Sequence, residues 1–206
     1  MTGRIFIDLF MTLDGVAQAP GAPDEDTSGG FPYGGWQAPV ADELVGREVV
    51  AGIEQLDALV LGRRTYDIFA AYWPNHTDNM IGKRFEAVPK YVASRGAPEL
   101  GWAGTTQLGP DAAADVAALR ERHESIHVIG SIDFVQTLLA AEAYDELVLW
   151  VYPIVLGQGK KVFPDGATPA NLRLIAPPTA GSSGAVELHY APAGGQPQTG
   201  VMSADD

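Results

Sequence analysis

The clearest candidate for chemistry is a group of charged and polar residues that follows an apolar run. Residues 58–61 are apolar, Gly62 permits a tight turn, and Arg63, Arg64 and Thr65 come next, where a helical pattern begins. Free backbone N–H groups at a helix N-terminus, together with arginine side chains, can bind a phosphate. The alternative is a plain junction between a strand and a helix with solvated arginines, because short motifs of this kind also arise by chance.

Two other strand ends carry residues of the same kind. Ser94 and Arg95 lie at the end of an expected strand that starts at residue 90, and Gly130 and Ser131 follow another over 126–129. Strands and helices alternate through the middle of the chain, which indicates a mainly parallel sheet whose ligands bind beyond the carboxyl ends of the strands. Two helix N-termini and a serine–arginine pair at one sheet edge could hold a pyrophosphate and one further phosphate. A phosphorylated dinucleotide fits this description.

The composition limits the classes of function. The chain has 206 residues, of which 46% are hydrophobic, and this suits one domain with its own core. Its 13 Lys and Arg against 26 Asp and Glu give a net charge of -13, which argues against nucleic acid and anionic membranes as partners. It has no cysteine, and its four histidines lack metal-site spacing, so we expect no metal. Without a signal-peptide pattern or a long apolar span, the expected compartment is the cytoplasm.

Hydrophobic periodicity predicts the elements that must position these residues. Expected strands cover 4–10, 58–61, 90–94, 126–129, 145–155, 172–176 and 186–190, and expected helices cover 41–56, 65–72, 110–123 and 132–141. The last two strands are separated by turn residues, which is typical of an antiparallel hairpin. The predicted fold class is therefore α/β, with a mainly parallel central sheet, helices on both faces and a C-terminal antiparallel hairpin. Residues 1–191 would form the domain and residues 192–206 a flexible tail.

The segment 14–39 is far longer than an ordinary connection, and it carries three aromatic residues, Phe31, Tyr33 and Trp36. A disordered insertion is one interpretation, but three aromatics are unusual in a flexible, solvated segment. We therefore expect a loop that packs over a pocket, with these side chains against a ligand.

Four segments, in the right order, resemble one family. Residues 62–67 (GRRTYD) resemble its Gly-Arg-x-Thr-aromatic-acid motif, and residues 128–131 (VIGS) resemble its Val-Ile-Gly-Gly turn. Residues 13–15 (LDG) and 153–159 (PIVLGQG) are similar to segments typical of one branch. Over most of residues 4–190 the chain resembles the dihydrofolate reductase superfamily, in particular the riboflavin-biosynthesis reductase-type, RibD C-terminal-like branch. The resemblance implies a three-layer dihydrofolate-reductase-like fold.

The resemblance implies NADPH as the hydride donor. The paired arginines and Thr65 would bind its phosphates, Ser94 and Arg95 its adenosine 2′-phosphate, and residues 130–134 its pyrophosphate and nicotinamide. The full set of expected cofactor-binding residues is Val16, Ala17, Gly62, Arg63, Arg64, Thr65, Ser94, Arg95, Ile129, Gly130, Ser131, Ile132, Asp133 and Phe134. The expected substrate-binding residues are Phe31, Tyr33, Trp36 and Tyr66.

The substrate half resembles the family less well than the cofactor half does. Ser131 replaces the second glycine of the turn, where its hydroxyl could bond a phosphate oxygen. Ile129 and Phe69 stand where the riboflavin branch tends to carry acidic residues. Apolar side chains there would leave the hydrogen-bonding groups of a ribityl phosphate unpaired. We therefore expect the riboflavin precursor to be a poor substrate and a flatter, pterin-like acceptor to be a better one.

The expected function is that of an NADPH-dependent reductase, which transfers a hydride to a C=N or similar unsaturated bond of a small pterin- or pyrimidine-like heterocycle. The product nitrogen also needs a proton. The candidate donors are Asp14, in the loop before Gly15, and Asp42, in a position similar to the pterin-binding carboxylate of dihydrofolate reductases. A turn residue and a helix cap are the respective alternatives. The alternative function is a non-catalytic nucleotide- or flavin-binding module.

Assembly is the last expectation from the sequence. Reductases that this chain resembles are commonly homodimers. The strand 147–152 (LVLWVY) carries more hydrophobic surface than one sheet face usually needs, and pairing with a second copy would explain it. We therefore expect a homodimer.

Overall fold

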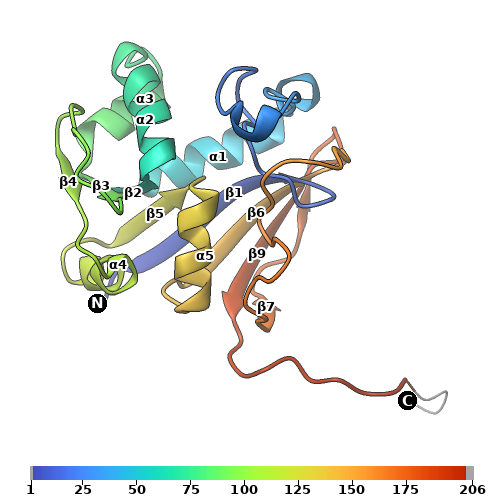
Figure 1. Cartoon of the computed structure of the whole chain (residues 1–206). Coiled ribbons are helices and arrows are strands. Elements are labelled where there is room, and N and C mark those ends of the chain that lie inside the picture. The colour runs from blue at the N-terminus through green and yellow to red at the C-terminus, as the bar shows by residue number, and fades with distance from the viewer. Residues whose placement is uncertain (1, 203–206) are drawn as a thin grey trace.

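The computed structural model describes residues 2–202 as an α/β protein built on one sheet (Figure 1). The strands are β1 (Arg4–Thr12), β2 (Ala58–Gly62), β3 (Lys90–Ala93), β4 (Thr105–Gln107), β5 (Ser125–Ile129), β6 (Glu146–Tyr152), β7 (Leu172–Leu174), β8 (Thr179–Ala180) and β9 (Val186–Pro192). They pair in the order β4-β3-β2-β5-β1-β6-β9-β7, with β8 beside β9. The helices are α1 (Glu43–Gln55), α2 (Arg63–Tyr72), α3 (Met80–Ala87), α4 (Ala112–Ala118) and α5 (Ile132–Ala140).

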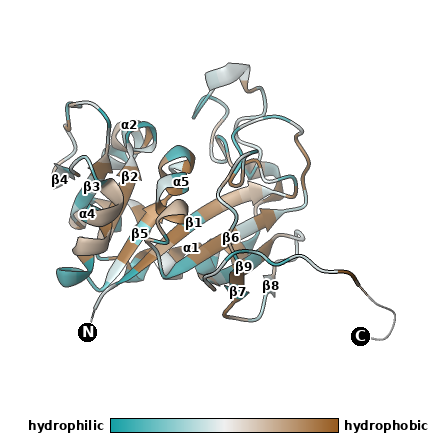
Figure 2. Ribbon diagram, turned by 60° about the horizontal axis from the view of Figure 1, so that its bottom comes forward, coloured by the Kyte–Doolittle hydropathy of each residue, from teal (hydrophilic) through white to brown (hydrophobic). Residues whose placement is uncertain are grey.

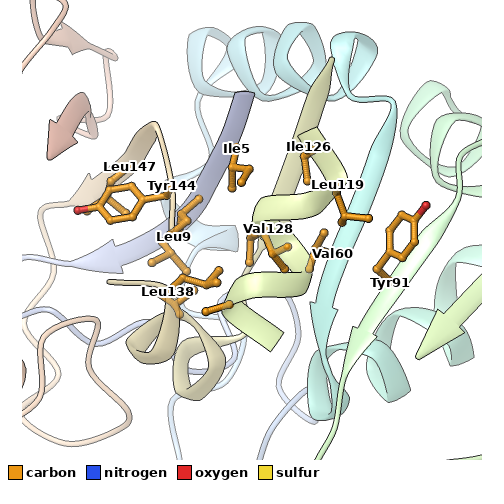
Figure 3. Packing of buried hydrophobic residues seen from close by; sticks show 14 of the residues in the cluster. Ile5, Leu9, Val60, Tyr91, Leu119, Ile126, Val128, Leu138, Tyr144 and Leu147 are labelled. Carbon is orange, nitrogen blue, oxygen red and sulfur yellow. The ribbon is translucent and has the colours of Figure 1, made fainter. Parts of the chain in front are cut away.

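The alternation of side chains along β1 separates the two faces of the sheet. Ile5, Ile7 and Leu9 are buried on one face, where they pack with residues of β5, α4 and α5 in the larger core (Figure 3). On the other face, Ile53 at the end of α1 and Phe85 of α3 pack with apolar residues of β2. Figure 2 shows the hydrophobic colour concentrated along the central strands. The expected arrangement, with helices on both faces, is confirmed.

The strand directions also confirm the expected fold class. The strands from β4 to β6 pair in parallel, whereas β7, β8 and β9 pair antiparallel. The structure adds β4 and α3, which the periodicity did not indicate, because β4 is short and polar and α3 has only eight residues. The helix expected at 65–72 begins two residues earlier, at Arg63, directly after the strand.

The hydrophobic strand 147–152, which was the reason to expect a homodimer from the sequence, does not supply a surface for a second copy. β6 lies between β1 and β9 inside the sheet, and Leu147, Leu149, Trp150 and Tyr152 are all buried within the chain itself. A strand covered on both faces reads as a continuous apolar run. The hydrophobic surplus of β6 therefore needs no second copy, and the homodimer stays a prediction without this support.

The end of the chain departs slightly from the expected boundary at residue 191. β9 continues to Pro192, residues 193–202 contain no helix or strand and lead away from the sheet (Figure 1), and residues 203–206 lie outside the described residues. The flexibility of the tail stays a prediction. None of the helices in residues 2–202 combines the length and the apolar character that crossing a membrane requires.

A charged cluster joins the antiparallel strands to the parallel part of the sheet. His189 of β9 lies between two glutamates, with Nδ1 2.5 Å from Glu146 Oε1 and Nε2 3.1 Å from Glu187 Oε1. Arg4 of β1 also bonds Glu146, at 2.8 Å. The hydrogen bonds to the two carboxylates raise the pKa of His189 to about 10.

We predict that His189→Gln lowers the melting temperature in a pH-dependent way. Because the pKa of His189 in the folded state lies above its ordinary value of 6.5, the charged imidazole stabilises the fold fully below pH 6.5, and this contribution is lost as the pH rises through about 10. The difference in melting temperature between parent and variant, measured by calorimetry, should therefore shrink steadily over this interval. A difference that stays constant with pH would contradict the assignment.

Candidate functional site

The carboxyl ends of β1, β2, β3 and β5 border a cleft of about 2130 Å³. Its lining comes from the end of β1 and the loop after it, from α2 along its whole length, and from the first turns of α5. The residues that follow β3, residues 107–112 and Lys160 complete it. Ordinary small-molecule pockets measure roughly 300–1,000 Å³, so this cleft has room for a ligand of dinucleotide size and a second, smaller molecule. It lies at the sheet edge where the sequence placed the anion site.

Two helix N-termini are tied together at one wall of the cleft. The backbone N–H of Gly62, before α2, donates to Ser131 Oγ at 2.8 Å, and the backbone N–H of Ser131, before α5, donates to Thr65 Oγ1 at 3.0 Å. The Ser131 hydroxyl donates in turn to the carbonyl oxygen of Ile129 at 3.2 Å. These bonds fix α2 and α5 relative to each other. The Ser131 hydroxyl therefore acts as a link between the two turns, and its expected bond to a phosphate stays a prediction.

The backbone at this junction explains the residue types. A Cβ at Gly62 would lie 3.2 Å from Phe134 Cβ and 3.3 Å from Ser131 Cβ, so a side chain there would push the turns apart. Gly130 and Ser131 both have a φ of 60°, in the left-handed region that glycine adopts freely and serine does not. The hydrogen bonds of the serine hydroxyl offset part of this cost. Serine can thus stand at a left-handed position that favours glycine.

Four cations line the cleft, and the protein's own acids hold three of them. Arg63 Nε bonds Asp67 Oδ1 at 2.7 Å within the first turns of α2. Lys160 Nζ lies 2.6 Å and Arg64 NH1 3.3 Å from the same oxygen, Asp26 Oδ2. The fourth is Arg95, which is exposed just beyond β3. A phosphate entering the cleft would therefore compete with Asp26 for two cations.

The loop after β1 is folded against the body of the protein. Buried Gln18 holds it from both sides, since its amide nitrogen donates to the carbonyl oxygens of Asp26 and Ser28, each at 2.9 Å, and its amide oxygen accepts from the Lys160 N–H at 3.0 Å. Glu25 accepts two backbone N–H bonds within the loop, and burial raises the pKa of its carboxyl group. The loop is thus an ordered wall of the cleft, as expected.

The family follows from comparison of the sequence. The profile of the RibD C-terminal domain matches residues 4–182. The chain belongs to this family. Among curated proteins, the uncharacterized protein YyaP from Bacillus subtilis (strain 168) is 26% identical over 192 residues, which make up 91% of this chain and 94% of YyaP. YwjB from the same organism, also uncharacterized, is 27% identical over 138 residues, 66% of this chain and 74% of YwjB.

Solved structures share the fold of this RibD C-terminal domain at lower identity. A putative riboflavin biosynthesis protein from Shewanella sp. PV-4 matches with a TM-score of 0.68 and 20% identity, over 92% of this chain and 98% of that one. Dihydrofolate reductase from Enterococcus faecalis, complexed with NADP(H), matches with a TM-score of 0.54 and 15% identity, over 94% and 99% of the two chains. The dihydrofolate-reductase-like fold expected from the sequence is confirmed.

The structure corrects the placement of the expected substrate-binding aromatics. Phe31 and Trp36 are buried in a separate apolar cluster with residues of β6, and Trp36 Nε1 donates to the Gln18 carbonyl oxygen at 2.8 Å. Tyr33 packs edge-on against Phe31 and is half exposed. Tyr66 is buried, and its hydroxyl accepts from the Trp102 backbone N–H at 3.0 Å. All four lie outside the lining of the cleft, where they support the loop and α2.

The cofactor half fits the expected positions better. Of the residues expected there, Val16 is the exception, because it is buried in the same apolar cluster as Trp36 and does not reach the cleft. The others line the cleft, namely Ala17, Gly62, Arg63, Arg64, Thr65, Ser94, Arg95, Ile129, Gly130, Ser131, Ile132, Asp133 and Phe134.

The two expected proton donors are occupied elsewhere. The Asp14 carboxylate accepts from the Thr12 hydroxyl at 2.6 Å and from the Gly157 N–H at 2.7 Å, and these bonds lower its pKa. Asp42 is the N-cap of α1, and it also accepts from the hydroxyl of Ser182 and the N–H of Ser183, each at 2.8 Å. Neither residue lines the cleft. Their roles are those of a turn residue and a helix cap, which corrects the sequence-based assignment.

The structure brings a different carboxylate to the cleft, that of Asp8. Its Oδ2 lies 2.7 Å from His127 Nδ1, and its carbonyl oxygen accepts from the Gly130 N–H at 3.1 Å. The available signal in the sequence was an aspartate in an otherwise apolar strand, on the side of the strand that it shares with Phe6 and Phe10. An acid in that position is costly to bury without a partner.

We predict that Asp42→Ala lowers the melting temperature at neutral pH while leaving ligand binding in the cleft unchanged. Four hydrogen bonds, the one from Ser182 first, hold the pKa of Asp42 well below its ordinary value of 3.8. A lowered pKa stabilises the fold above pH 3.8, and this contribution is lost as the pH falls below that value. The difference in melting temperature between parent and variant should thus shrink on acidification. A variant of unchanged melting temperature at pH 7 would refute the capping role.

Proposed function

We propose that this RibD C-terminal domain protein is an NADPH-dependent reductase that acts on a C=N or similar unsaturated bond of a small heterocycle. Membership of the family supports a reductase on a pyrimidine-like substrate. The observation that carries the cofactor assignment is the junction at which Gly62 and Ser131 hold two helix N-termini on one wall of the cleft. Oriented N–H groups and helix dipoles favour phosphate there.

The charged residues of the cleft suit the phosphorylated form of the cofactor. Arg63 and Arg64 open α2 beside the junction, where they would bind the pyrophosphate together with Thr65. Arg95 lies at the end of the neighbouring strand, beside Ser94, and would bind the adenosine 2′-phosphate. When bound, NADPH supplies a hydride from C4 of its nicotinamide. The chain's residues then place the acceptor and exclude water.

The remaining lining suits a flat ring more than a sugar phosphate. Ile129 and Phe69 line the cleft and are partly buried. An apolar side chain offers no partner to a ribityl hydroxyl, and each polar group left unpaired would cost about 1–3 kcal/mol. A pterin or another conjugated imine has faces that such side chains can cover.

We predict that Arg95→Ala reduces the preference of the protein for NADPH over NADH. A charge-assisted hydrogen bond to the 2′-phosphate contributes about 1.5–3 kcal/mol, or roughly ten- to a hundred-fold in affinity. Equilibrium titrations should show weaker NADPH binding and unchanged NADH binding. Equal loss for both cofactors would place Arg95 at a shared part of the dinucleotide and overturn its assignment.

We predict that Asp26→Asn strengthens NADPH binding. The largely buried Asp26 carboxylate pairs with Lys160 and Arg64 near the surface of the cleft, and surface ion pairs contribute about 0.2–1 kcal/mol each. Removing the competing charge should raise NADPH affinity by roughly two- to ten-fold at low salt, and by less as salt screens the charges. Asp165→Asn, which changes an exposed acid outside the cleft, is the matched control and should leave the affinity unchanged. Weaker binding by Asp26→Asn would mean that Asp26 itself holds the ligand.

We predict that the protein prefers a pterin-like acceptor to the riboflavin precursor. The test is a paired assay of NADPH oxidation with dihydrofolate and with the ribosylaminopyrimidine at equal concentrations. The apolar Ile129 and Phe69 should make dihydrofolate the better acceptor. Efficient turnover of the ribosylaminopyrimidine would overturn this account of the substrate half and leave the cofactor half standing. If the protein oxidises NADPH with neither of the two acceptors, the proposed reductase function is overturned.

A further inference from the structure

Asp8, which lines the cleft, is the first member of a series of hydrogen bonds that continues along β5. Its Oδ2 lies 2.7 Å from Nδ1 of His127, on the neighbouring strand β5. His127 is only 6% exposed, and its ring stacks on Phe6 with the ring centroids 4.7 Å apart. Stacking and burial leave the imidazole one orientation, in which Nδ1 points at the carboxylate.

The series continues to the opposite edge of the sheet. Nε2 of His127 lies 3.2 Å from the Ser125 hydroxyl, and Ser125 is the first residue of β5, partly exposed and level with Arg4 at the start of β1. A neutral imidazole donates from one ring nitrogen and accepts at the other. Nδ1–H therefore donates to Asp8, and Nε2 accepts from the Ser125 hydroxyl. The chain of hydrogen bonds from Asp8 through His127 to Ser125 thus runs from the cleft to the partly exposed start of β5.

We propose that Asp8 is the catalytic acid of the reduction and that His127 and Ser125 are positioning residues that hold its carboxyl group at the cleft. This inference rests on the proposed reductase function. Asp14 and Asp42 lie outside the cleft, and among the described residues that line it Asp8 is the one carboxylate carried by a sheet strand. The other acids of the lining belong to the loop after β1, to the middle of α2, to the N-cap of α4 and to the first turn of α5, namely Asp24, Glu25, Asp26, Asp67, Asp111 and Asp133.

The step balances in atoms and charge. The acceptor carbon of the C=N bond gains a hydride from NADPH, the nitrogen gains a proton from the Asp8 carboxyl group, and one C–H and one N–H bond replace the π bond. The proton leaves from Oδ1 of Asp8 while Oδ2 keeps its hydrogen bond from His127 Nδ1–H, and solvent water returns a proton to Asp8 once the product has left the cleft. The His127 ring keeps its Nδ1–H tautomer throughout the step.

The first test is kinetic, with NADPH and dihydrofolate or the ribosylaminopyrimidine, whichever the parent reduces faster. Asp8→Ala and the isosteric Asp8→Asn should lower kcat at least about 100-fold, the contribution of a general acid, with NADPH affinity unchanged. Formate should restore at least about a tenth of the parental kcat to Asp8→Ala, where it can enter the vacated space, and none to Asp8→Asn. His127→Gln should lower kcat with KM unchanged. Asp165→Asn, which removes an exposed acid outside the cleft, is the charge control.

The second test needs no turnover. Long-range proton–nitrogen NMR spectra of the histidine rings, with His127 assigned by its loss in His127→Gln, should show the Nδ1–H tautomer in the parent and its loss in Asp8→Ala. Failure of the parent to oxidise NADPH with either acceptor overturns the reductase function, and this inference with it. Turnover by both Asp8 variants within about threefold of the parent, where a general acid would contribute about 100-fold or more, overturns the inference alone. An Nε2–H tautomer of His127 in the parent would also overturn the inference alone.

Discussion

Two hydrogen bonds at the junction of β2–α2 with β5–α5 set the position of everything in the cleft. One runs from the Gly62 N–H to Ser131 Oγ and joins residues that are 69 positions apart in the chain. The other runs from the Ser131 N–H to Thr65 Oγ1 and joins residues that are 66 positions apart. The junction tolerates no side chain at Gly62 without displacement of Phe134 or Ser131. Two helix N-termini are therefore fixed before any ligand arrives, and oriented N–H groups that need no rearrangement bind anions at little entropic cost.

Electrostatics explain how such a site works in an acidic protein. With a net charge of -13, the chain repels anions at long range, and the cations of the cleft are scarce. The protein holds two of them, Arg64 and Lys160, on Asp26 of the loop after β1. A phosphate would thus replace an existing ion pair, so that its binding is an exchange of partners and its net affinity depends on how readily the loop releases them. The same pairing keeps the loop ordered against the sheet.

The sequence predicted the fold and the position of the cleft because both leave local signals. Apolar strands that end at Gly62 and Gly130 identify a parallel sheet and its ligand edge. The site's acids and aromatics could not be assigned in this way. A carboxylate at the start of a helix, like Asp42, has the same local sequence pattern whether it caps the helix or faces a ligand. Only the fold shows that residues 182 and 183 donate hydrogen bonds to it. In the sequence Trp36 resembles a ligand contact, and only the folded structure shows that it is buried against β6.

The proposed function requires that the cleft bind a phosphorylated nicotinamide dinucleotide. Equilibrium titration of the purified full chain with NADPH, NADH and FMN, at one pH and one salt concentration, tests it most directly. We predict saturable binding of NADPH that is roughly ten- to a hundred-fold tighter than that of NADH, the value of one charge-assisted contact to the 2′-phosphate, and no saturable binding of FMN. Equal affinity for NADPH and NADH, or saturable binding of FMN without NADPH, would contradict the account.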